Sequence, residues 1–309
     1  MPTSTAPRTT AIIVTYNSRP TIGRTLEVCR EIHQAKGLDC IVIDNASHDG
    51  TADWVRQEHP WVRVVSNKEN RGFARGCNQG FALAMTPYSL VLNPDAVLPL
   101  AGLQTMERFM DEHPRAGIAG PATRRQRDDR FQWAGGLPTP WKLVKNCTPF
   151  LNRQAAYRTI VPDEPPFRTD WICGAILLLR KAMLEALEGF DPSFFLYYEE
   201  TDLCRRAVLA GWEIWAIGQA VGEHVCSASA IDSGGEIHRG CLSEHFYRSR
   251  YYYMRKHFGF LSAVFGEVGE LLMLSVLATP RWLLRRNTDA FAKRVRAPIL
   301  SLPERVPGE

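Results

Sequence analysis

Short apolar runs alternate with amphipathic segments along the N-terminal third of the chain. The apolar runs lie at residues 11–15, 40–44, 62–65 and 88–92. Segments with apolar residues at helical spacing separate them, at 20–36, 51–58 and 72–85. Strands that alternate with helices in this way predict a mostly parallel central sheet with right-handed crossovers and helices on its faces. The predicted fold class is therefore α/β.

Polar clusters follow three of these strands. They are Thr15–Ser18, Asp44–Gly50 and Asn93–Asp95. Open α/β sheets bind ligands beyond the carboxyl ends of their strands, so three clusters on one edge predict a ligand site there.

The later part of the chain is organised differently. From about 122 to 169 the regular pattern disappears, which is typical of a functional or flexible loop. An apolar strand at 171–179 follows, then helices at 181–187 and 200–210. Residues 238–286 are predicted to be mainly helical. We expect a catalytic domain over 1–237, with a nucleotide-sugar half at about 10–122 and an acceptor half at about 123–237. A helical extension with a basic tail is expected over 238–309.

Composition narrows the class of protein. The chain has 309 residues, of which 45% are hydrophobic and 23% charged, as in ordinary globular proteins. A formal net charge of only +4 does not indicate a nucleic-acid binder. Eight cysteines include no C-x-x-C pair, which favours reduced, buried thiols in a cytoplasmic protein. The N-terminus carries no apolar stretch of the kind found in signal peptides.

Two strand-end carboxylates are candidate ligands. Asp95 has the chemistry to hold Mg²⁺ or Mn²⁺, which prefer oxygen ligands and often bridge phosphates. Asn93-Pro94-Asp95 is equally consistent with an ordinary turn. Asp44 is placed to accept hydrogen bonds from a nucleobase or ribose, although a local cap is the alternative.

Residues 70–80, NRGFARGCNQG, surround a predicted helix start with glycines and two arginines. Free main-chain amides, together with Arg71 or Arg75, are suited to a diphosphate. The alternative for Arg75 is a solvated position on the helix.

A second acidic cluster lies in FFLYYEETDLCRR, residues 194–206. Glu199, Glu200 and Asp202 follow four aromatic residues at a predicted helix start, where one or two acids would serve as caps. An aromatic surrounding raises the proton affinity of a carboxylate and suits it to general-base catalysis. His224 ends a later strand and has the chemistry of a metal ligand, although a lone histidine is usually structural.

Taken in order, the motifs resemble those of the inverting family 2 glycosyltransferases of GT-A fold, with the nearest likeness to bacterial rhamnosyltransferases. The matching segments are VTYN (14–17), VIDNASHDG (42–50), NRGFARGCNQG (70–80), LNPDA (92–96), WICGAILLLRK (171–181), FFLYYEETDLCRR (194–206) and GEHV (222–225). Each motif is weak alone, but the ordered set is specific and spans residues 11 to about 258.

The resemblance implies a role for each matching position. Asp95 would take the D-x-D position, with Asn93 in place of its first acid, and His224 would join it as a ligand of Mg²⁺ or Mn²⁺. Glu200 would be the general base, with Asp202 as a neighbour and Glu199 as its rival for that role. The expected donor-binding residues are Thr15, Tyr16, Asn17, Asp44, Asn70, Arg71, Gly72, Arg75, Asn93 and Asp95.

The implied activity is transfer of a sugar, best guessed as rhamnose from dTDP-rhamnose, to a glycan or lipid-linked acceptor in cell-surface polysaccharide synthesis. A UDP-hexose or UDP-galactofuranose donor and a catalytically silent sugar-nucleotide binder are the alternatives. A dinucleotide oxidoreductase is disfavoured, because no G-x-G-x-x-G follows the first strand.

The C-terminal region carries a long apolar segment at 260–278. Glu267 and Glu270 within it weaken a transmembrane interpretation. Either the segment packs on the catalytic domain or in a homodimer, or it rests on the inner face of the membrane. Residues 281–309 hold 7 basic and 3 acidic groups, which is the whole surplus of +4. The stretch 260–296 is thus a candidate for peripheral membrane contact. The basic residues expected on its surface are Arg281, Arg285, Arg286, Lys293, Arg294 and Arg296.

Overall fold

A computed structural model describes residues 6–147, 157–225, 241–283 and 294–303. The chain divides into two compact units, each drawn from separate segments. We call Met1–Gly135, Tyr157–Pro192 and Glu199–Ser229 the sheet unit, and Gly136–Ala156, Ser193–Tyr198 and Ala230–Glu309 the helical unit. The boundary expected at residue 237 lies outside the described residues and stays a prediction.

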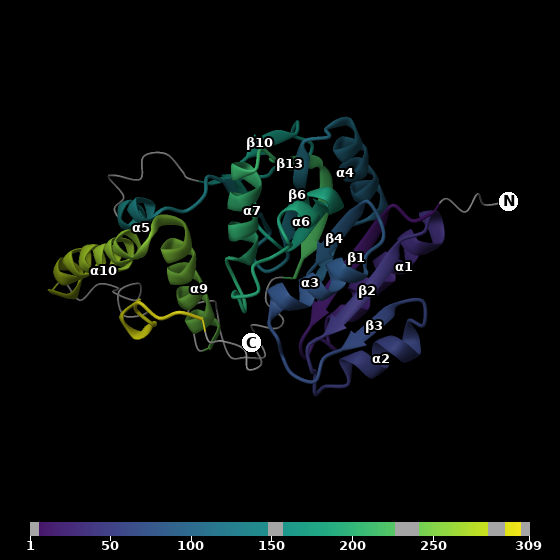
Figure 1. The fold of residues 1–309 in the computed structure, drawn as a ribbon, viewed down its shortest axis with the longest axis horizontal. Coiled ribbons are helices and arrows are strands. Elements are labelled where there is room, and N and C mark those ends of the chain that lie inside the picture. Colours follow the sequence, from purple (N-terminus) through teal and green to yellow (C-terminus); the bar gives the residue numbers. More distant parts are fainter. Residues whose placement is uncertain (1–5, 148–156, 226–240, 284–293, 304–309) are drawn as a thin grey trace. The chain divides into compact units, whose positions relative to one another are not determined.

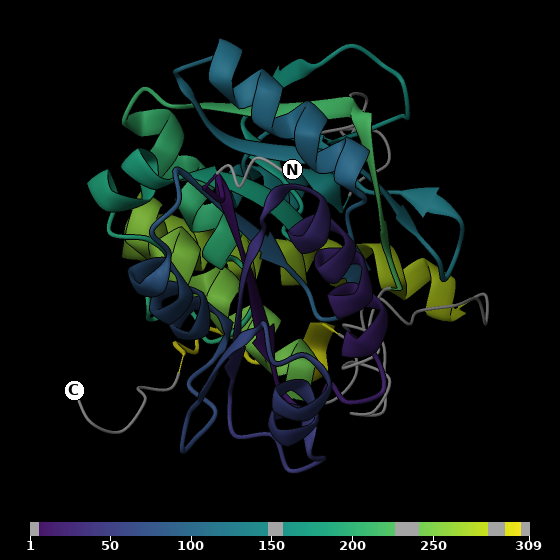
Figure 2. The same cartoon turned by 90° about the vertical axis from the view of Figure 1, so that its right-hand side faces the viewer.

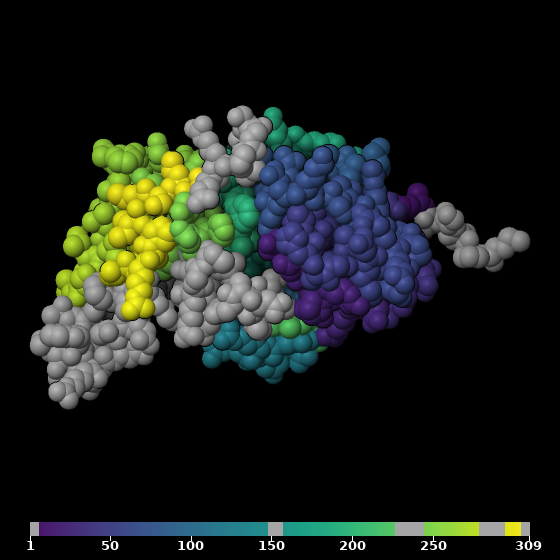
Figure 3. All heavy atoms as spheres, turned by 90° about the horizontal axis from the view of Figure 1, so that it is seen from below, coloured from purple at the N-terminus to yellow at the C-terminus, as the bar shows by residue number. Residues whose placement is uncertain are grey.

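The first half of the sheet unit is the predicted alternation of strands and helices. Its strands are parallel, in the order β4-β1-β2-β3 (Figure 1). They are β1 (Thr9–Thr15), β2 (Asp39–Asp44), β3 (Arg63–Ser66) and β4 (Tyr88–Leu92). The intervening helices are α1 (Ile22–Lys36), α2 (Thr51–Glu58) and α3 (Phe73–Leu83). In the space-filling view, this part of the chain, purple to blue, forms one continuous surface (Figure 3).

The second half extends the same sheet through a strand that runs the other way. β12 (Ile176–Arg180) pairs antiparallel with both β4 and β6 (Ala116–Arg125). Beyond β6 the sheet continues with β13 (Glu213–His224) and β10 (Phe167–Thr169), while β5 (Ala96–Val97) and β7 (Arg130–Phe131) pair at its side. The remaining helices of this unit are α4 (Leu100–Glu112), α6 (Lys181–Ala186) and α7 (Glu199–Leu209). The sheet is mixed but mostly parallel in its central part, as predicted.

β1 separates the two faces of the sheet by alternation of its side chains. Ala11 and Ile13 pack into the cluster that includes the apolar side of α1. Ile12 and Val14 point to the opposite face, where α3 lies (Figure 2). A Cβ on Gly80 would come within 2.4 Å of Ile12. Glycine there lets α3 approach the strand closely.

The segment expected to be irregular contains short elements. A separate three-stranded sheet joins β8 (Trp133–Gly135) to β9 (Tyr157–Thr159) and β11 (Trp171–Ile172). β6 and β7 occupy the start of the same segment. Apart from β6 its strands are only two or three residues long, which is too short to show a local periodicity.

The helical unit contains three described helices, α5 (Pro140–Asn146), α9 (Cys241–Phe258) and α10 (Phe260–Leu283). α10 packs closely on α5, because a Cβ on Gly266 would lie 3.0 Å from Pro140 and one on Gly269 would lie 2.8 Å from Val144. The helical character expected of this region is thus present.

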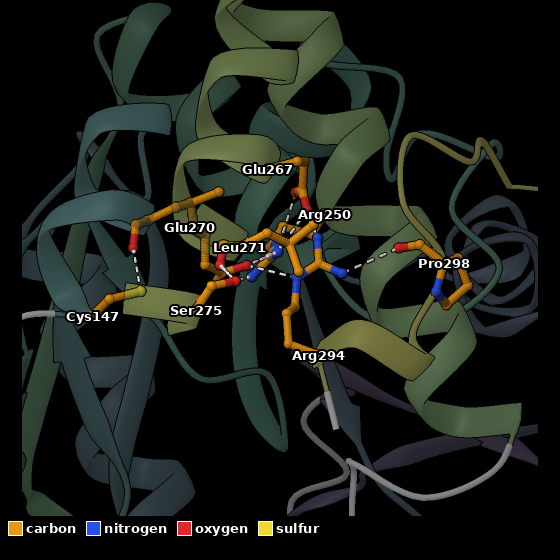
Figure 4. Close-up of polar contacts among 9 residues, drawn as sticks. Cys147, Arg250, Glu267, Glu270, Leu271, Ser275, Arg294 and Pro298 are labelled. Atoms are coloured by element: carbon orange, nitrogen blue, oxygen red, sulfur yellow. Dashed lines mark hydrogen bonds and ion pairs between the residues drawn. The ribbon is translucent and has the colours of Figure 1, made fainter. Parts of the chain in front are cut away.

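Four charged side chains form a buried ion-pair cluster in this unit (Figure 4). Arg250 donates to Glu267 at 2.9 Å and to Glu270 at 3.0 Å, and Arg294 donates to Glu270 at 2.8 Å and also pairs with Glu267. Arg294 is only 2% exposed, so its expected place on a basic surface is wrong. Its guanidinium is withdrawn from solvent because two carboxylates of α10 neutralise it. Arg296 is exposed, whereas Arg281, Arg285, Arg286 and Lys293 lie outside the residues whose side chains are described.

Candidate active site

The loops after β1 and β2 are held together through Asp44. Its Oδ1 accepts hydrogen bonds from Thr15 Oγ1 at 2.8 Å and from Ser47 Oγ at 2.6 Å, while Oδ2 accepts from the Ser47 amide at 3.0 Å. Asp44 is only 2% exposed. Most of its hydrogen-bonding capacity therefore shapes the two loops themselves. Sequence reasoning missed Ser47, although a serine three residues after an aspartate is a common turn signal.

Tyr16 and Asn17 lie at the end of β1, on the edge predicted to bind a ligand. The Tyr16 ring is 45% exposed. Asn17 has a positive φ of 51° and accepts a hydrogen bond from the His48 amide at 2.8 Å. The left-handed backbone turns the chain away from the strand and leaves an aromatic face at the sheet edge. Such a face is suited to stacking on a planar ring.

The loop before α3 has the features of an anion site. Asn70 Oδ1 accepts from the Gly72 amide at 3.0 Å, and Gly72 adopts a φ of 83° that glycine tolerates best. No side chain caps α3 at Gly72, which leaves the first amides of the helix available. Arg71 is half-buried, and its Nε has no hydrogen-bond partner among the described residues. A buried guanidinium nitrogen beside free amides fits a phosphate oxygen.

Arg75 is engaged with the protein. Its Nε donates to the Pro192 carbonyl at 3.1 Å. Gly76 and Gly80 of the same motif pack against Val14 and Ile12. Thus, among these glycines, Gly72 forms the turn and the other two serve helix packing.

Asp95 and His224 meet although 129 residues separate them. β5 pairs antiparallel with the end of β13, and His224 lies opposite Ala96. This pairing brings His224 next to Asp95, the residue that directly precedes β5. His224 Nε2 then lies 3.0 Å from Asp95 Oδ1. Both side chains are largely buried. The two residues selected from distant motifs are therefore neighbours.

This pair fits a divalent metal. A carboxylate oxygen and an imidazole nitrogen converge on one point, which is a donor set that Mn²⁺ accepts. No group of three or more His, Cys, Asp or Glu side chains suited to a metal occurs among the described residues. Two protein ligands with the remaining positions left to water and phosphate oxygens are typical of cations that bind nucleotides. Asn93 Nδ2 lies 3.3 Å from His224 Nε2 and borders the same point.

Gln132 contacts the other nitrogen of the His224 ring. Its Nε2 lies 3.2 Å from His224 Nδ1, and the residue is only 5% exposed. A partner on one ring nitrogen fixes the ring orientation and the tautomer that the other nitrogen presents. No sequence pattern points to Gln132, because it lies in the segment without periodicity.

Glu199 and Glu200 begin α7 and differ in their surroundings. Glu199 is 6% exposed, and its Oε2 has no hydrogen-bond partner among the described residues. Glu200 is half-buried; its Oε1 accepts from Thr201 Oγ1 at 3.2 Å and lies 3.4 Å from the indole nitrogen of Trp171. Glu200 thus has a hydrogen-bonded carboxylate with access to solvent, whereas Glu199 is enclosed.

Both glutamates bind protons more tightly than an ordinary glutamate. Burial raises the pKa of Glu200 above its usual value of 4.5, although hydrogen bonds from Thr201 and Trp171 oppose the rise. Burial and then the charge of Glu200 raise the pKa of Glu199 well above the same value. Carboxylates whose pKa is raised in this way are suited to proton transfer.

Asp202 is placed differently from the other two acids. It is fully buried and accepts a hydrogen bond from Arg206 Nε at 2.7 Å, one turn along α7. Arg206 in turn donates to the carbonyls of Leu187 at 2.6 Å and Gly189 at 2.7 Å. The pair therefore ties α7 to the loop that follows α6.

A short path of contacts joins the metal candidates to the glutamates. The Asn93 amide donates to the Ala175 carbonyl at 3.0 Å. Next to Ala175, a Cβ on Gly174 would lie 3.1 Å from Glu200 Cγ. The end of β4 and the start of α7 are thus linked through residues 174 and 175. All four of these residues belong to the sheet unit.

Comparison with known proteins gives a consistent result. A model of "Glycosyl transferase family 2" matches residues 10–186, more than half of the chain. The N-acetylglucosaminyl-diphospho-decaprenol L-rhamnosyltransferase of Mycobacterium tuberculosis is 27% identical over 219 residues, which are 65% of this chain and 70% of the relative. Rhamnosyltransferase WbbL of Escherichia coli is 37% identical over 128 residues, 40% of this chain and 47% of the relative.

Solved structures with the same architecture are more distant in sequence. Mannosyltransferase PcManGT from Pyrobaculum calidifontis, in complex with GDP-Man and Mn²⁺, has a TM-score of 0.54 at 17% identity, covering 94% of this chain and 86% of that one. S. aureus TarS in complex with UDP has a TM-score of 0.53 at 14% identity, covering 88% of this chain and 70% of that one. At these identities the likeness shows the fold, and the predicted GT-A arrangement is confirmed.

Proposed function

Because the chain belongs to glycosyl transferase family 2, we propose that it transfers a sugar from a nucleotide-sugar to an acceptor hydroxyl with inversion at the anomeric carbon. One observation carries this proposal. The Asp95–His224 pair and the raised-pKa glutamates of α7 lie on one contact path in the sheet unit. A site for a nucleotide-bound cation next to a carboxylate base is what direct displacement by a hydroxyl needs.

Glu200 is assigned as the general base. In the displacement, Glu200 takes the proton of the acceptor hydroxyl while the hydroxyl oxygen attacks the anomeric carbon. The bond to the diphosphate oxygen breaks with its electron pair on the leaving group. The half-buried carboxylate of Glu200 has access to an acceptor, whereas Glu199 is nearly closed off. Asp202 acts through Arg206 as a positioning residue for α7.

Donor binding is assigned to the carboxyl edge of β1, β2 and β4. Arg71 and the first amides of α3 bind the diphosphate, and the exposed Tyr16 ring stacks on the nucleobase. Asp44 organises the loops that present these groups. Asp95 and His224 would hold Mg²⁺ or Mn²⁺, which when bound neutralises charge on the diphosphate. PcManGT, which has a similar fold, was solved in complex with Mn²⁺.

The test of the base compares two isosteric variants. Glu200→Gln is expected to lower the transfer rate by roughly 10²–10⁴-fold, because the hydroxyl proton loses its acceptor. Donor affinity measured by calorimetry should stay near the wild-type value. Glu199→Gln should keep a much larger share of the rate. Loss of transfer in Glu199→Gln together with an active Glu200→Gln would move the assignment to Glu199.

The donor is proposed to be dTDP-rhamnose, because two of the similar proteins are rhamnosyltransferases. A UDP-hexose or UDP-galactofuranose is the alternative. A panel of these nucleotide-sugars, with and without Mn²⁺, should show one preferred donor by affinity and by release of the nucleoside diphosphate. Preference for a UDP-sugar would overturn the choice of donor while leaving the mechanism intact.

The acceptor is proposed to be a glycan or a lipid-linked saccharide in cell-surface polysaccharide synthesis, with the reaction on the cytoplasmic side. A purely binding role is the competing function. Release of nucleoside diphosphate that depends on added acceptor supports catalysis, whereas tight donor binding with no turnover on any acceptor fraction would favour the binding role.

A further inference from the structure

The outer side of α10 is an apolar stripe that faces solvent. Its members follow helical spacing along the helix: Leu261 is 80% exposed, Phe265 51%, Val268 36%, Leu272 63% and Val276 68%. The window from Phe260 to Leu277 is long and apolar enough to cross a membrane by length and composition. A soluble surface rarely shows so long a row of large apolar side chains without a partner.

Trp141 of α5 extends this stripe. The side chain is 57% exposed, and its ring stacks on Phe265 with centroids 6.4 Å apart and planes 11° from parallel. We call Trp141 and the exposed apolar residues of α10 the apolar stripe. A tryptophan with its ring half in solvent is typical of surfaces that contact the membrane interface.

The two carboxylates of α10 point away from the apolar stripe. Between Phe260 and Leu277 the only ionisable residues are Glu267 and Glu270. Glu267 is buried and Glu270 is largely buried, and both pair with Arg250 and Arg294 (Figure 4). The helix thus directs its carboxylates into the protein and its apolar residues outward, the reverse of a helix on a soluble surface.

The charge of the helical unit distinguishes two possible partners of the apolar stripe, a lipid surface and a second copy of the chain. The segments of the helical unit contain 15 basic and 8 acidic residues, whereas those of the sheet unit contain 22 and 25. The unit that carries the stripe is therefore strongly basic. Two such units brought face to face in a homodimer would repel each other, but an anionic bilayer would attract them.

We propose that the apolar stripe docks the protein on an anionic phospholipid bilayer, with α10 lying in the plane of the interface. The stripe inserts among the lipid headgroups, and the surplus of basic residues meets their phosphates. α10 rests along the surface and does not cross the bilayer, because its inner side is packed on α5 and on the buried ion pairs. Arg255 and Lys256, both exposed, lie in the last turn of α9, the helix before α10.

The experiment measures binding of the full chain to vesicles without any donor. Wild type should cosediment with phosphatidylcholine vesicles that contain roughly a third phosphatidylglycerol. Cosedimentation should be weaker with vesicles of phosphatidylcholine alone. It should also be weaker in about 0.5 M salt, because the Debye length falls to about 4 Å and the electrostatic attraction is screened. Leu261→Gln/Leu272→Gln should lower the partition coefficient by about tenfold or more, because two inserted side chains become polar.

The matched control is Leu209→Gln, since Leu209 is 72% exposed but lies on α7 of the sheet unit. It should bind vesicles as wild type does. Circular dichroism and thermal melting establish that each variant is folded. Lipids brominated near the headgroups should quench tryptophan fluorescence in wild type, and less in Trp141→Phe.

Two outcomes would overturn the proposal. One is vesicle binding that the double variant leaves unchanged. The other is absence of vesicle binding, with a concentration-dependent dimer that the double variant abolishes, which would assign the stripe to a second copy of the chain. Neither outcome touches the proposed transfer reaction, because the assay contains no donor and alters no residue of the site.

Discussion

Glu199 and Glu200 are adjacent in the chain, yet Glu199 is buried and Glu200 is only half-buried. Because burial raises the pKa of Glu200, the carboxylate form needed for proton transfer is lost at a higher pH than in an ordinary glutamate. The transfer rate should therefore fall as the pH is lowered, beginning above the usual value of 4.5. The measurement is the transfer rate at saturating donor, recorded from about pH 5 to about pH 8. Donor affinity is recorded at each pH to separate loss of binding from loss of catalysis. A residual rate in Glu200→Gln with the same pH dependence would contradict this assignment.

Gln132 provides a second test at the residue scale. Its amide faces His224 Nδ1 at 3.2 Å and so fixes how the ring presents Nε2 to the candidate metal position. Gln132→Ala should weaken Mn²⁺ affinity by roughly 10–100-fold, as is common when the outer partner of a metal-binding histidine is lost. Calorimetric titration of Mn²⁺ in the presence of nucleoside diphosphate measures this directly.

The control for that variant is another glutamine near the same strand. Gln126 donates to Glu223 Oε2 at 3.1 Å, one residue before His224, and does not bond to the ring. Gln126→Ala should leave Mn²⁺ affinity unchanged. Equal losses in the two variants would mean that Gln132 acts only through the stability of the strand.

At the scale of elements, the approach of α3 to β1 depends on a residue without a side chain. A Cβ on Gly80 would lie 2.4 Å from Ile12, which is itself fully buried. Gly80→Ala should lower the free energy of unfolding by about 1–3 kcal/mol, because a packed core gives way poorly to added volume. Gly23→Ala on α1 is the control, since its Cβ would meet Trp54 at an ordinary 3.6 Å. Urea unfolding of both variants measures the difference; equal stability of the two would contradict the packing argument.

The elements predicted from the sequence were those with strong local periodicity. Helices at 22–36, 73–83, 181–186 and 199–209 were anticipated within a few residues, as were β1, β2 and β4. α4 and β6 were not assigned at all. β6 contains two glycines and a proline, and its place in the sheet comes from pairing with β12 and β13 far along the chain. Such pairing leaves no local signal.

The site residues also divide into those with a local sequence signal and those that depend on contacts between distant segments. Motif order identified the family, and strand ends located Asp95, while the meeting of Asp95 with His224 required the β5–β13 pairing. Ser47 and Gln132 escaped notice because each acts on another side chain and has no chemistry of its own. Trp171 was assigned to a strand, but its contact with Glu200 depends on how β11 lies beside α7.

At the scale of the whole molecule, the helical unit depends on buried charge. Glu267 is 1% exposed and pairs with both Arg250 and Arg294. Glu267→Ala should cost about 3–5 kcal/mol of unfolding free energy, because it leaves two buried guanidinium groups with only one carboxylate, that of Glu270, to neutralise them. Glu244→Ala removes a partly exposed pair with Arg248 and should cost about 0–1 kcal/mol. Denaturant unfolding followed by circular dichroism measures both. A small cost at Glu267 would mean that the cluster is open to water.

The separation of Asp95 and His224 by 129 residues has a consequence for folding. The strands that carry the proposed donor-binding loops are made early in the chain, but β13, the last strand that the structure describes, supplies the second residue of the proposed metal site. Pairing across so long a loop comes late, because its closure entropy is large. On the proposed assignment, a nascent chain that ends before β13 would have the nucleotide loops but could not hold the cation between two side chains. Metal affinity would then report completion of the sheet.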